Sequence, residues 1–184
     1  MNTKHRCLTV LLAAASMCLG SGAQESNQIS YTARRKPLIS STNNYGPITV
    51  KPSGNRQVIV KYRSNAKSVI FENEHHGNRI MPRTNSDTAG TNLAEYIVLA
   101  PSDSVLTVWA AGEVRIEGFV GDAVLETGGS PIVVNGFTNA HVHVRTVAGP
   151  VTVSAVHNSH VYLQAVSGDI TYSGFRIRSL KRVR

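Results

Sequence analysis

Histidines recur at a fixed spacing in the second half of the chain. His141 and His160 lie 19 residues apart, and His143 follows His141 by two positions. Residues two apart in an extended strand point to the same face, and imidazole is a common ligand of zinc and copper. These three histidines are the metal-ligand candidates of the sequence. No carboxylate is in phase with them, and polar side chains line the solvated face of any strand, so we predict neither a bound metal nor a cofactor.

Paired carboxylates are the second kind of chemistry to consider, because glycan-cleaving enzymes use two that face each other across the scissile bond. Glu113 and Glu117 lie four residues apart, whereas Glu126, Asp122 and Asp169 belong to other turns. No general acid and base converge in this pattern. Nothing resembles the strained turn that carries a nucleophilic serine. The sequence therefore predicts no catalytic residue and no enzyme.

The elements that would position these side chains form a repeat of about 19 residues. Each copy has an alternating apolar strand, a glycine, a second short strand and then a Gly-Phe pair or its small apolar substitute. A period near 19 is too long for a coiled-coil heptad and too short for a helical-pair repeat, but it suits one coil of a stacked β-solenoid. The anchoring positions are Gly112, Gly129, Gly149 and Gly168, followed by Phe119, Phe137, Val156 and Phe175.

The alternation within a copy predicts which side chains point inward. Val142 and Val161 are in the same phase 19 residues apart, so they should stack in the interior while the neighbouring histidines face outward. The Phe series should form an interior ladder, with a small residue before each member at a corner. Counting from Val105 as an inward position, Trp109 also points into the core. We therefore predict an all-β, right-handed parallel β-helix-like solenoid.

The region before the repeats is less regular. Gly46 to Val50 reads as an early copy, and the segments 57–62, 69–71 and 96–99 read as strands because they are rich in β-branched and aromatic residues. Residues 72–94 have no periodicity and many turn-forming residues, so we expect an excursion loop there. The loop contains His75 and His76 beside two glutamates, without an ordered ligand spacing.

The first 23 residues predict a secretory signal peptide. Lys4 and Arg6 supply a positive start, residues 8–19 an apolar stretch, and residues 21–23 a small-residue cleavage site. The apolar stretch is short of the roughly 20 residues that a membrane span needs. We expect an exported chain, periplasmic or secreted, with no transmembrane segment after the signal is removed.

Both cysteines, Cys7 and Cys18, lie within this predicted signal. Cys18 could instead be the lipidated residue of a lipoprotein, but bulky Met17 precedes it where such sites take a small residue. If the signal is removed after residue 23, the mature chain holds no thiol, which excludes disulfides and cysteine-ligated metals.

The chain is basic, with a formal charge of +8 that falls to +6 when Lys4 and Arg6 leave with the signal. Basic residues gather in residues 34–36 and in the tail at residues 176–184. In an exported protein this charge favours an anionic envelope glycan, a lipid headgroup or a surface protein as partner, rather than nucleic acid. The simpler alternative is that terminal charge keeps the ends soluble.

The order of these motifs resembles the bacterial putative adhesin domain family of exported proteins. The matching segments are 46–50, 96–101, 105–108, 112–122 and 166–174. The resemblance covers about residues 30–175 and implies an adhesin-like β-solenoid without catalytic residues. Many relatives continue for several more coils, whereas here a basic tail follows. Either this tail caps the last coil, or that edge is open to a partner, for example by end-to-end self-association.

These observations predict a signal peptide at 1–23, a flexible stretch at 24–30, one solenoid domain at 31–175 and a basic tail at 176–184. The function expected is binding of a glycan or protein through a repetitive polar face. Two alternatives stay open. One is a minimal β-helix enzyme acting on polysaccharide, and the other is a scaffold or sensor of envelope stress.

Overall fold

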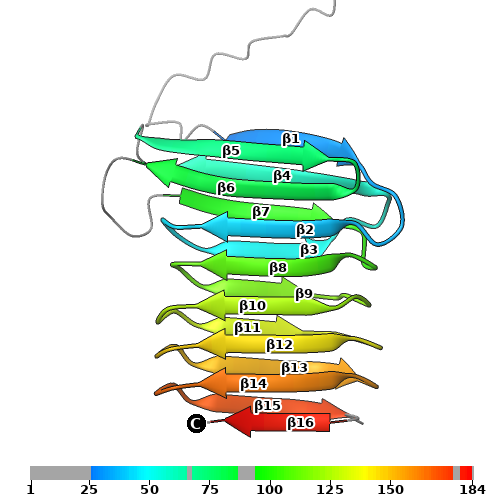
Figure 1. Ribbon diagram of the computed structural model, residues 1–184, viewed down its shortest axis with the longest axis vertical. Coiled ribbons are helices and arrows are strands. Elements are labelled where there is room, and N and C mark those ends of the chain that lie inside the picture. Colours follow the sequence, from blue (N-terminus) through cyan, green and yellow to red (C-terminus); the bar gives the residue numbers. More distant parts are fainter. Residues whose placement is uncertain (1–25, 66–67, 87–93, 176–178, 184) are drawn as a thin grey trace, which may run out of the picture.

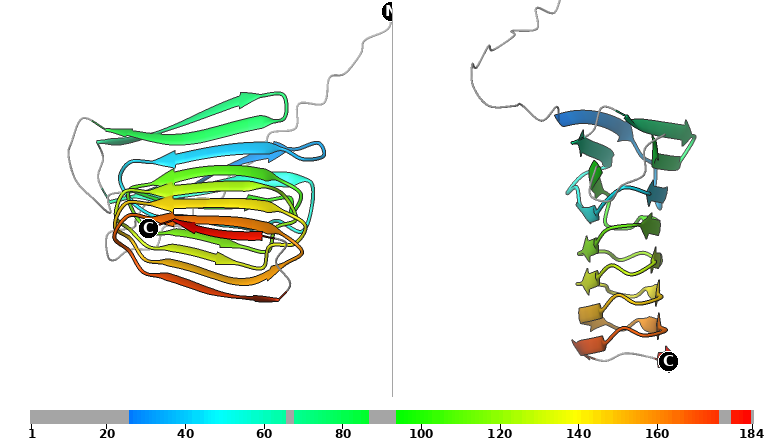
Figure 2. Two further views of the ribbon diagram at one scale, coloured as in Figure 1. Left: turned by 60° about the horizontal axis from the view of Figure 1, so that its bottom comes forward. Right: turned by 90° about the vertical axis from the view of Figure 1, so that its left-hand side faces the viewer.

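The computed structural model describes residues 26–65, 68–86, 94–175 and 179–183. Strands and the turns between them make up this part of the chain, and no helix occurs within it. The strands form two sheets that face each other as layers and extend along the long axis of the molecule (Figures 1 and 2). The prediction of an all-β protein is confirmed.

We call the two layers sheet A and sheet B. In spatial order, sheet A consists of β1 (Ser26–Thr32), β4 (Gln57–Ser64), β7 (Ala94–Ala100), β3 (Ile48–Pro52), β9 (Val114–Glu117), β11 (Ile132–Asn135), β13 (Val151–His157) and β15 (Ile170–Phe175). Sheet B consists of β16 (Ser179–Val183), β14 (His160–Ala165), β12 (His141–Thr146), β10 (Ala123–Thr127), β8 (Val105–Ala110), β2 (Leu38–Asn43), β6 (Arg79–Ser86) and β5 (Val69–His76).

From β8 onward, successive strands alternate between the two sheets, and each pairs in parallel with the next strand of its own sheet. In sheet B, Val142 of β12 pairs with Val161 of β14, and His141 pairs with His160. In sheet A, Val134 of β11 pairs with Val153 of β13. Residues 19 apart are therefore neighbours on adjacent strands, as the repeat predicts.

The core lies between the two sheets, where the inward residues of both layers meet. Phe119, Phe137 and Val156 are completely buried, and the rings of the two phenylalanines lie 6.1 Å apart between centroids. The backbone of Phe175 pairs with His157, while its side chain lies outside the described part of the molecule.

The corner before each ladder residue requires an unusual backbone conformation. Gly118 and Gly136 both have a φ of 77°, and Ala155 takes the same left-handed region with a φ of 51°. Only glycine enters this region without steric cost. The third copy therefore makes the same corner with a strained alanine.

Three of the four anchoring glycines lie where the backbones of neighbouring strands approach closely. A Cβ on Gly149 would be 2.0 Å from the Ser130 carbonyl oxygen, and one on Gly168 would be 2.0 Å from the Gly149 oxygen. Gly112 similarly lies against the backbone of residues 46–47. Gly129 differs, because the nearest atom to its added Cβ would be the Ala148 Cβ, 4.0 Å away.

The N-terminal end departs from parallel pairing. β1 pairs antiparallel with β4, β4 with β7, and β5 with β6. Aromatic rings fill the space between the layers at this end. Tyr62 and Phe71 have ring centroids 3.9 Å apart, and Phe71 packs edge-on against Tyr96 at 5.2 Å. Burial raises the pKa of Tyr96, whose hydroxyl has no hydrogen-bond partner among the described residues.

The excursion loop expected at residues 72–94 is wrong for its first part. β5 and β6 form an antiparallel hairpin that extends to Ser86, and residues 87–93 lie outside the description. β5 is the edge strand of sheet B, so its residues after Phe71 are partly or largely exposed and lack the apolar alternation of a buried strand. Backbone pairing to β6 holds this exposed part of β5 in place, while Phe71 packs against the core.

The expected terminal segments also need correction. Residues 26–30, expected to be flexible, belong to β1, and residues 179–183 of the basic tail form β16. Each is the outermost strand of its sheet. An edge strand pairs with one neighbour only and need not be rich in apolar residues, so its composition does not distinguish it from a loop or a tail. The predicted signal peptide at residues 1–23 lies outside the described residues, and no helix long enough and apolar enough to cross a membrane occurs in the described part.

Candidate binding face

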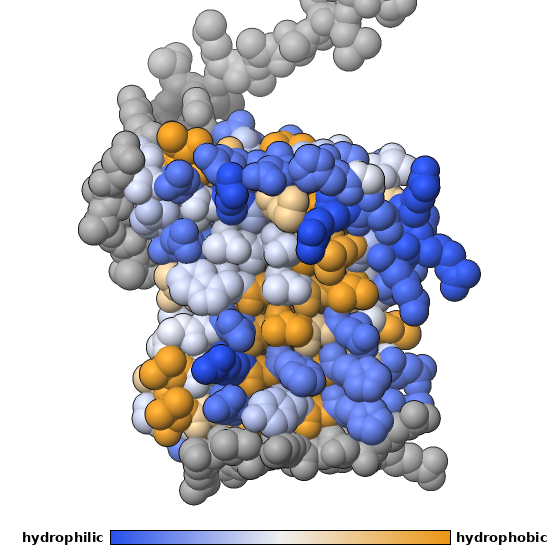
Figure 3. Space-filling model, viewed as in Figure 1, coloured by the Kyte–Doolittle hydropathy of each residue, from blue (hydrophilic) through white to orange (hydrophobic). Residues whose placement is uncertain are grey.

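The outer face of sheet B carries side chains in three parallel columns, because every second residue of β8, β10, β12 and β14 points outward in register (Figure 3). The first column holds Asp122, His141 and His160. The second holds Thr107, Val124, His143 and Tyr162, and the third holds Trp109, Glu126, Arg145 and Gln164.

The first column brings two of the three candidate histidines together. The rings of His141 and His160 stack 5.0 Å apart between centroids and only 7° from parallel. The backbone N–H of His141 donates to Oδ1 of Asp122 at 2.7 Å, and Nδ1 of the ring lies 3.2 Å from the same oxygen. The expectation that no carboxylate is in phase with the histidines is wrong, since Asp122 lies one repeat before His141.

His143 belongs to the second column and contacts a different neighbour. Its ring lies 5.4 Å from that of Tyr162. The three histidines therefore do not converge on one point. No group of three or more His, Cys, Asp or Glu side chains able to hold a metal ion occurs in the part of the chain that the structure describes.

A shallow hollow of about 220 Å³ lies between the second and third columns. Its walls come from three adjacent strands, so the strand register alone builds it. The residues that line it are Val124, Glu126, His143, Val144, Arg145, Tyr162 and Gln164.

Arg145 differs from four other arginines of the molecule in its charge partners. Arg56, Arg63, Arg83 and Arg115 each form an ion pair with a carboxylate. Arg145 forms no ion pair with any residue that the structure describes, although Glu126 is its cross-strand neighbour. Arg145 therefore lines the hollow without a carboxylate partner among the described residues.

Trp109 lies on this outer face, and the prediction that it points into the core is wrong. Its exposed fraction is 37 %, while Leu106, Val108 and Ala110 of the same strand are buried. The error came from taking Val105 as inward, which also required Thr107 to be buried. The buried residues Leu106 and Val108 mark the inward side of β8, which leaves Trp109 on the outer side.

The candidate carboxylates of an enzyme do not form a catalytic pair. Glu113 lies 2.6 Å from the Arg115 guanidinium, and Glu117 lies 3.5 Å from the Lys51 ammonium group. Both ion pairs are on or beside sheet A, on the opposite side of the molecule from Asp122 and Glu126. Asp169 is exposed at the turn before β15.

His75 and His76 lie on the β5 edge rather than in a loop. The His75 ring packs 4.7 Å from Tyr31 of β1, and its Nε2 lies 2.8 Å from the Gly77 carbonyl oxygen. His76 lies 4.0 Å from the Glu74 carboxylate. The contact between His75 and Tyr31 joins the outermost strands of the two sheets.

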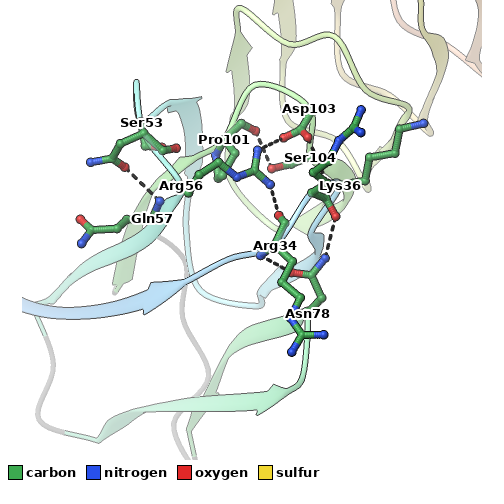
Figure 4. Close-up of polar contacts among 11 residues, drawn as sticks. Arg34, Lys36, Ser53, Arg56, Gln57, Asn78, Pro101, Asp103 and Ser104 are labelled. Carbon is green, nitrogen blue, oxygen red and sulfur yellow. Dashed lines mark hydrogen bonds and ion pairs between the residues drawn. The ribbon is translucent and has the colours of Figure 1, made fainter.

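The basic run at residues 34–36 is exposed, and its backbone belongs to a polar network that joins four turns (Figure 4). The Arg34 N–H donates to Oδ1 of Asn78 at 2.9 Å, and the Lys36 N–H donates to Oδ2 of Asp103 at 3.1 Å. The Arg56 guanidinium donates to the Arg34 carbonyl and pairs with Asp103 at 2.6 Å. The network holds together the turns from which these basic side chains project.

The charge of Asp103 depends on this network. Partial burial by itself would raise the pKa of its carboxyl group. The hydrogen bonds from Arg56 and from the Lys36 N–H, together with the positive charge of Arg56, outweigh burial. The pKa of Asp103 therefore lies below its ordinary value of 3.8.

A solved structure shares this architecture. A putative cell adhesion protein from Clostridium sporogenes superposes with a TM-score of 0.59 over 83 % of this chain and 100 % of its own, at 8 % sequence identity. The chain has the fold of this putative cell adhesion protein. A putative adhesin from Bacteroides fragilis matches with a TM-score of 0.41 over 88 % of this chain and 98 % of its own, at 9 % identity. No family model and no curated protein matches the chain.

The resemblance to the bacterial putative adhesin family is thus confirmed at the level of the fold. The features of the binding face that sequence reasoning missed are Trp109, Arg145 and the contact between Asp122 and His141. The last could have been found from the spacing of 19 residues between Asp122 and His141. The absence of an ion pair at Arg145 could not have been predicted, because the repeat makes Glu126 its cross-strand neighbour and therefore its expected partner.

Proposed function

We propose that this protein is an exported, non-catalytic, adhesin-like module that binds an envelope or extracellular glycan through the outer face of sheet B. The observation that carries the proposal is the three-column array on that face. It presents polar and aromatic side chains in register over four strands, with a hollow among them. Such a regular surface can bind a repeating polymer by many weak contacts.

The proposed architecture is a right-handed β-solenoid whose coils stack along the long axis. Support comes from the alternation of strands between sheets A and B and from the parallel pairing of residues one repeat apart. The right-handed winding follows the strong preference of parallel crossover connections. The antiparallel strands β1, β4 and β5 would cap the first coils.

Export is proposed from the signal-like segment at residues 1–23 and from the absence of cysteine after it. A role outside the cytoplasm also agrees with the name of the putative cell adhesion protein whose fold this chain shares. The absence of catalysis is supported by the ion pairs of Glu113 and Glu117, which occupy the carboxylates that an acid–base mechanism would need.

A glycan is favoured over a lipid surface or a protein because the outer face of sheet B mixes hydrogen-bonding groups with exposed rings. The exposed residues Trp109, His143 and Arg145 belong to this face, and no large apolar patch dominates it (Figure 3). Sugars combine hydroxyl groups with apolar ring faces, which aromatic side chains and polar groups recognise together.

The test is binding of the purified exported protein to an array of neutral and acidic glycans and to phosphatidylglycerol vesicles, at low and high salt. We expect binding to glycans that survives high salt. The variant Trp109→Ala/Tyr162→Ala should lose most of it, while the control Thr152→Ala/Thr171→Ala on the outer face of sheet A should not. Equal loss in both variants, or binding to vesicles alone that salt abolishes, would contradict the proposal.

A further inference from the structure

The hollow on the outer face of sheet B has a specific chemistry. We propose that it binds the carboxylate-bearing sugar unit of an acidic glycan, with Arg145 as the group that binds the carboxylate. This inference rests on the proposed function and names the ligand class of the same face.

Among the residues that line the hollow, Arg145 is the one suited to an anion. Arginine offers five N–H donors in a planar fork that matches the two oxygens of a carboxylate. The four arginines compared with it already bind carboxylates within the molecule. Arg145 is exposed and forms no ion pair with a described residue, so an incoming carboxylate would not have to displace a partner.

The two neighbours of Arg145 in the third column supply complementary groups. Gln164 on one side offers an amide, and Glu126 on the other offers a carboxylate; both side chains are half-buried. Both can accept hydrogen bonds from sugar hydroxyls. Since Glu126 adds a negative charge, the hollow suits a singly charged carboxylate better than a doubly charged phosphate.

Aromatic rings flank these polar groups. Tyr162 and His143 line the hollow with their rings 5.4 Å apart. Trp109 is in the same column as Arg145 but two strands away, which corresponds to about 10 Å. That separation places the exposed indole under a neighbouring unit of the same glycan rather than under the unit in the hollow.

The size of the hollow agrees with one sugar unit of a longer chain. Its volume of about 220 Å³ is smaller than the roughly 300 Å³ at which pockets for free drug-sized ligands begin. A small shallow site of this kind binds weakly by itself, and repeated units along a polymer increase the total affinity.

The experiment measures affinity for matched pairs of probes. Oligogalacturonides, oligoalginates and sialic-acid-terminated oligosaccharides are each titrated beside their carboxyl-reduced forms, with the full exported protein. We expect the carboxylated forms to bind about tenfold more tightly, as a charge-assisted hydrogen-bonded pair would give. Arg145→Gln should remove this preference while leaving affinity for the reduced forms unchanged.

The matched control is Arg79→Gln. Arg79 is exposed on β6 of the same sheet and likewise forms no ion pair with a described residue. Its substitution therefore removes the same charge at a position away from the hollow. If Arg79→Gln weakens binding as much as Arg145→Gln, or if reduced and carboxylated forms bind equally, the role of Arg145 is overturned while glycan binding stands. If no glycan in either form binds, both this inference and the proposed function fail.

Discussion

The imidazole rings of His141 and His160 stack 5.0 Å apart and 7° from parallel, although 19 residues separate them in the chain. The contact exists because β12 and β14 are adjacent parallel strands with His141 opposite His160. The same register stacks Val142 on Val161 in the core. One spacing therefore determines both the buried contacts and the exposed array.

The interior ladder should dominate stability. We expect Phe137→Ala to lower the free energy of unfolding by about 3 to 5 kcal/mol, because a fully buried ring leaves a cavity. His143→Ala on the outer face should change it by no more than about 0.5 kcal/mol. Equilibrium denaturation with urea measures both, and similar losses would show that the two sides are wrongly assigned.

Close backbone approach should make Gly149 intolerant of a side chain. Gly149→Ala would place its Cβ 2.0 Å from the Ser130 carbonyl oxygen, so neighbouring strands must separate. We expect a loss of about 1 to 3 kcal/mol, typical of overpacking. The matched change Gly129→Ala meets nothing nearer than 4.0 Å and should cost much less. Thermal melts of the two variants that coincide would argue against this difference.

The strained corner at Ala155 should be relieved by glycine. The left-handed conformation of Ala155 costs the folded state about 1 to 2 kcal/mol, which glycine would relieve. About half of this gain is offset because glycine is more flexible in the unfolded chain. Ala155→Gly should therefore raise the unfolding free energy by about 0.5 to 1 kcal/mol. Ala110→Gly, at a buried strand position, should lower it. Destabilisation by Ala155→Gly would mean that the corner is not strained.

The pH dependence of stability should reflect Asp103. Because its pKa in the folded protein lies below the ordinary 3.8, the carboxylate stabilises the fold above that pH. The contribution disappears as the pH falls through the lowered folded value. The difference in melting temperature between the wild type and Asp103→Asn should thus be largest near pH 7 and vanish in strong acid.

The control for this effect is Asp169→Asn, which removes an exposed carboxylate that forms no ion pair with a described residue. Its melting temperature should follow that of the wild type across the same pH range. A constant difference between the wild type and Asp103→Asn at all pH values would exclude an ionic contribution.

Zinc or copper should not stabilise the protein. Two stacked imidazoles and one carboxylate follow each other along a column instead of surrounding a point, and His143 faces Tyr162 in the next column. We expect no shift in melting temperature with an equimolar amount of either ion. A rise that His160→Ala removes would show that the side chains rearrange into a metal site.

The repeat region was predictable because its two periods are both visible in the sequence. Alternation of apolar and polar residues gives the inward and outward sides, as Val142 and His143 illustrate, and the spacing of 19 gives the partner strand. The same reasoning failed at Trp109, where Val105 suggested the opposite phase. There Leu106 and Val108, rather than Val105, mark the inward side of the strand.

The N-terminal hairpin was not predictable in the same way. β5 is an edge strand with Glu72, Glu74 and His75 on partly or largely exposed positions, so its sequence resembles a polar loop.

The arrangement of side chains in the hollow was not predictable either, because it depends on which charges pair across strands. That choice depends on side-chain geometry, and the residue types of Glu126 and Arg145 would have suggested an ion pair.

The alternation of inward and outward residues in β12 makes the fold sensitive to the length of its segments rather than to their outer composition. Deleting His143 would make Val142 and Val144 adjacent, so that one of these two buried valines would face water. Removing a whole repeat would instead shorten the array by one row and keep every remaining side chain on its side. Gain or loss of complete repeats is therefore the change in length that such a protein tolerates.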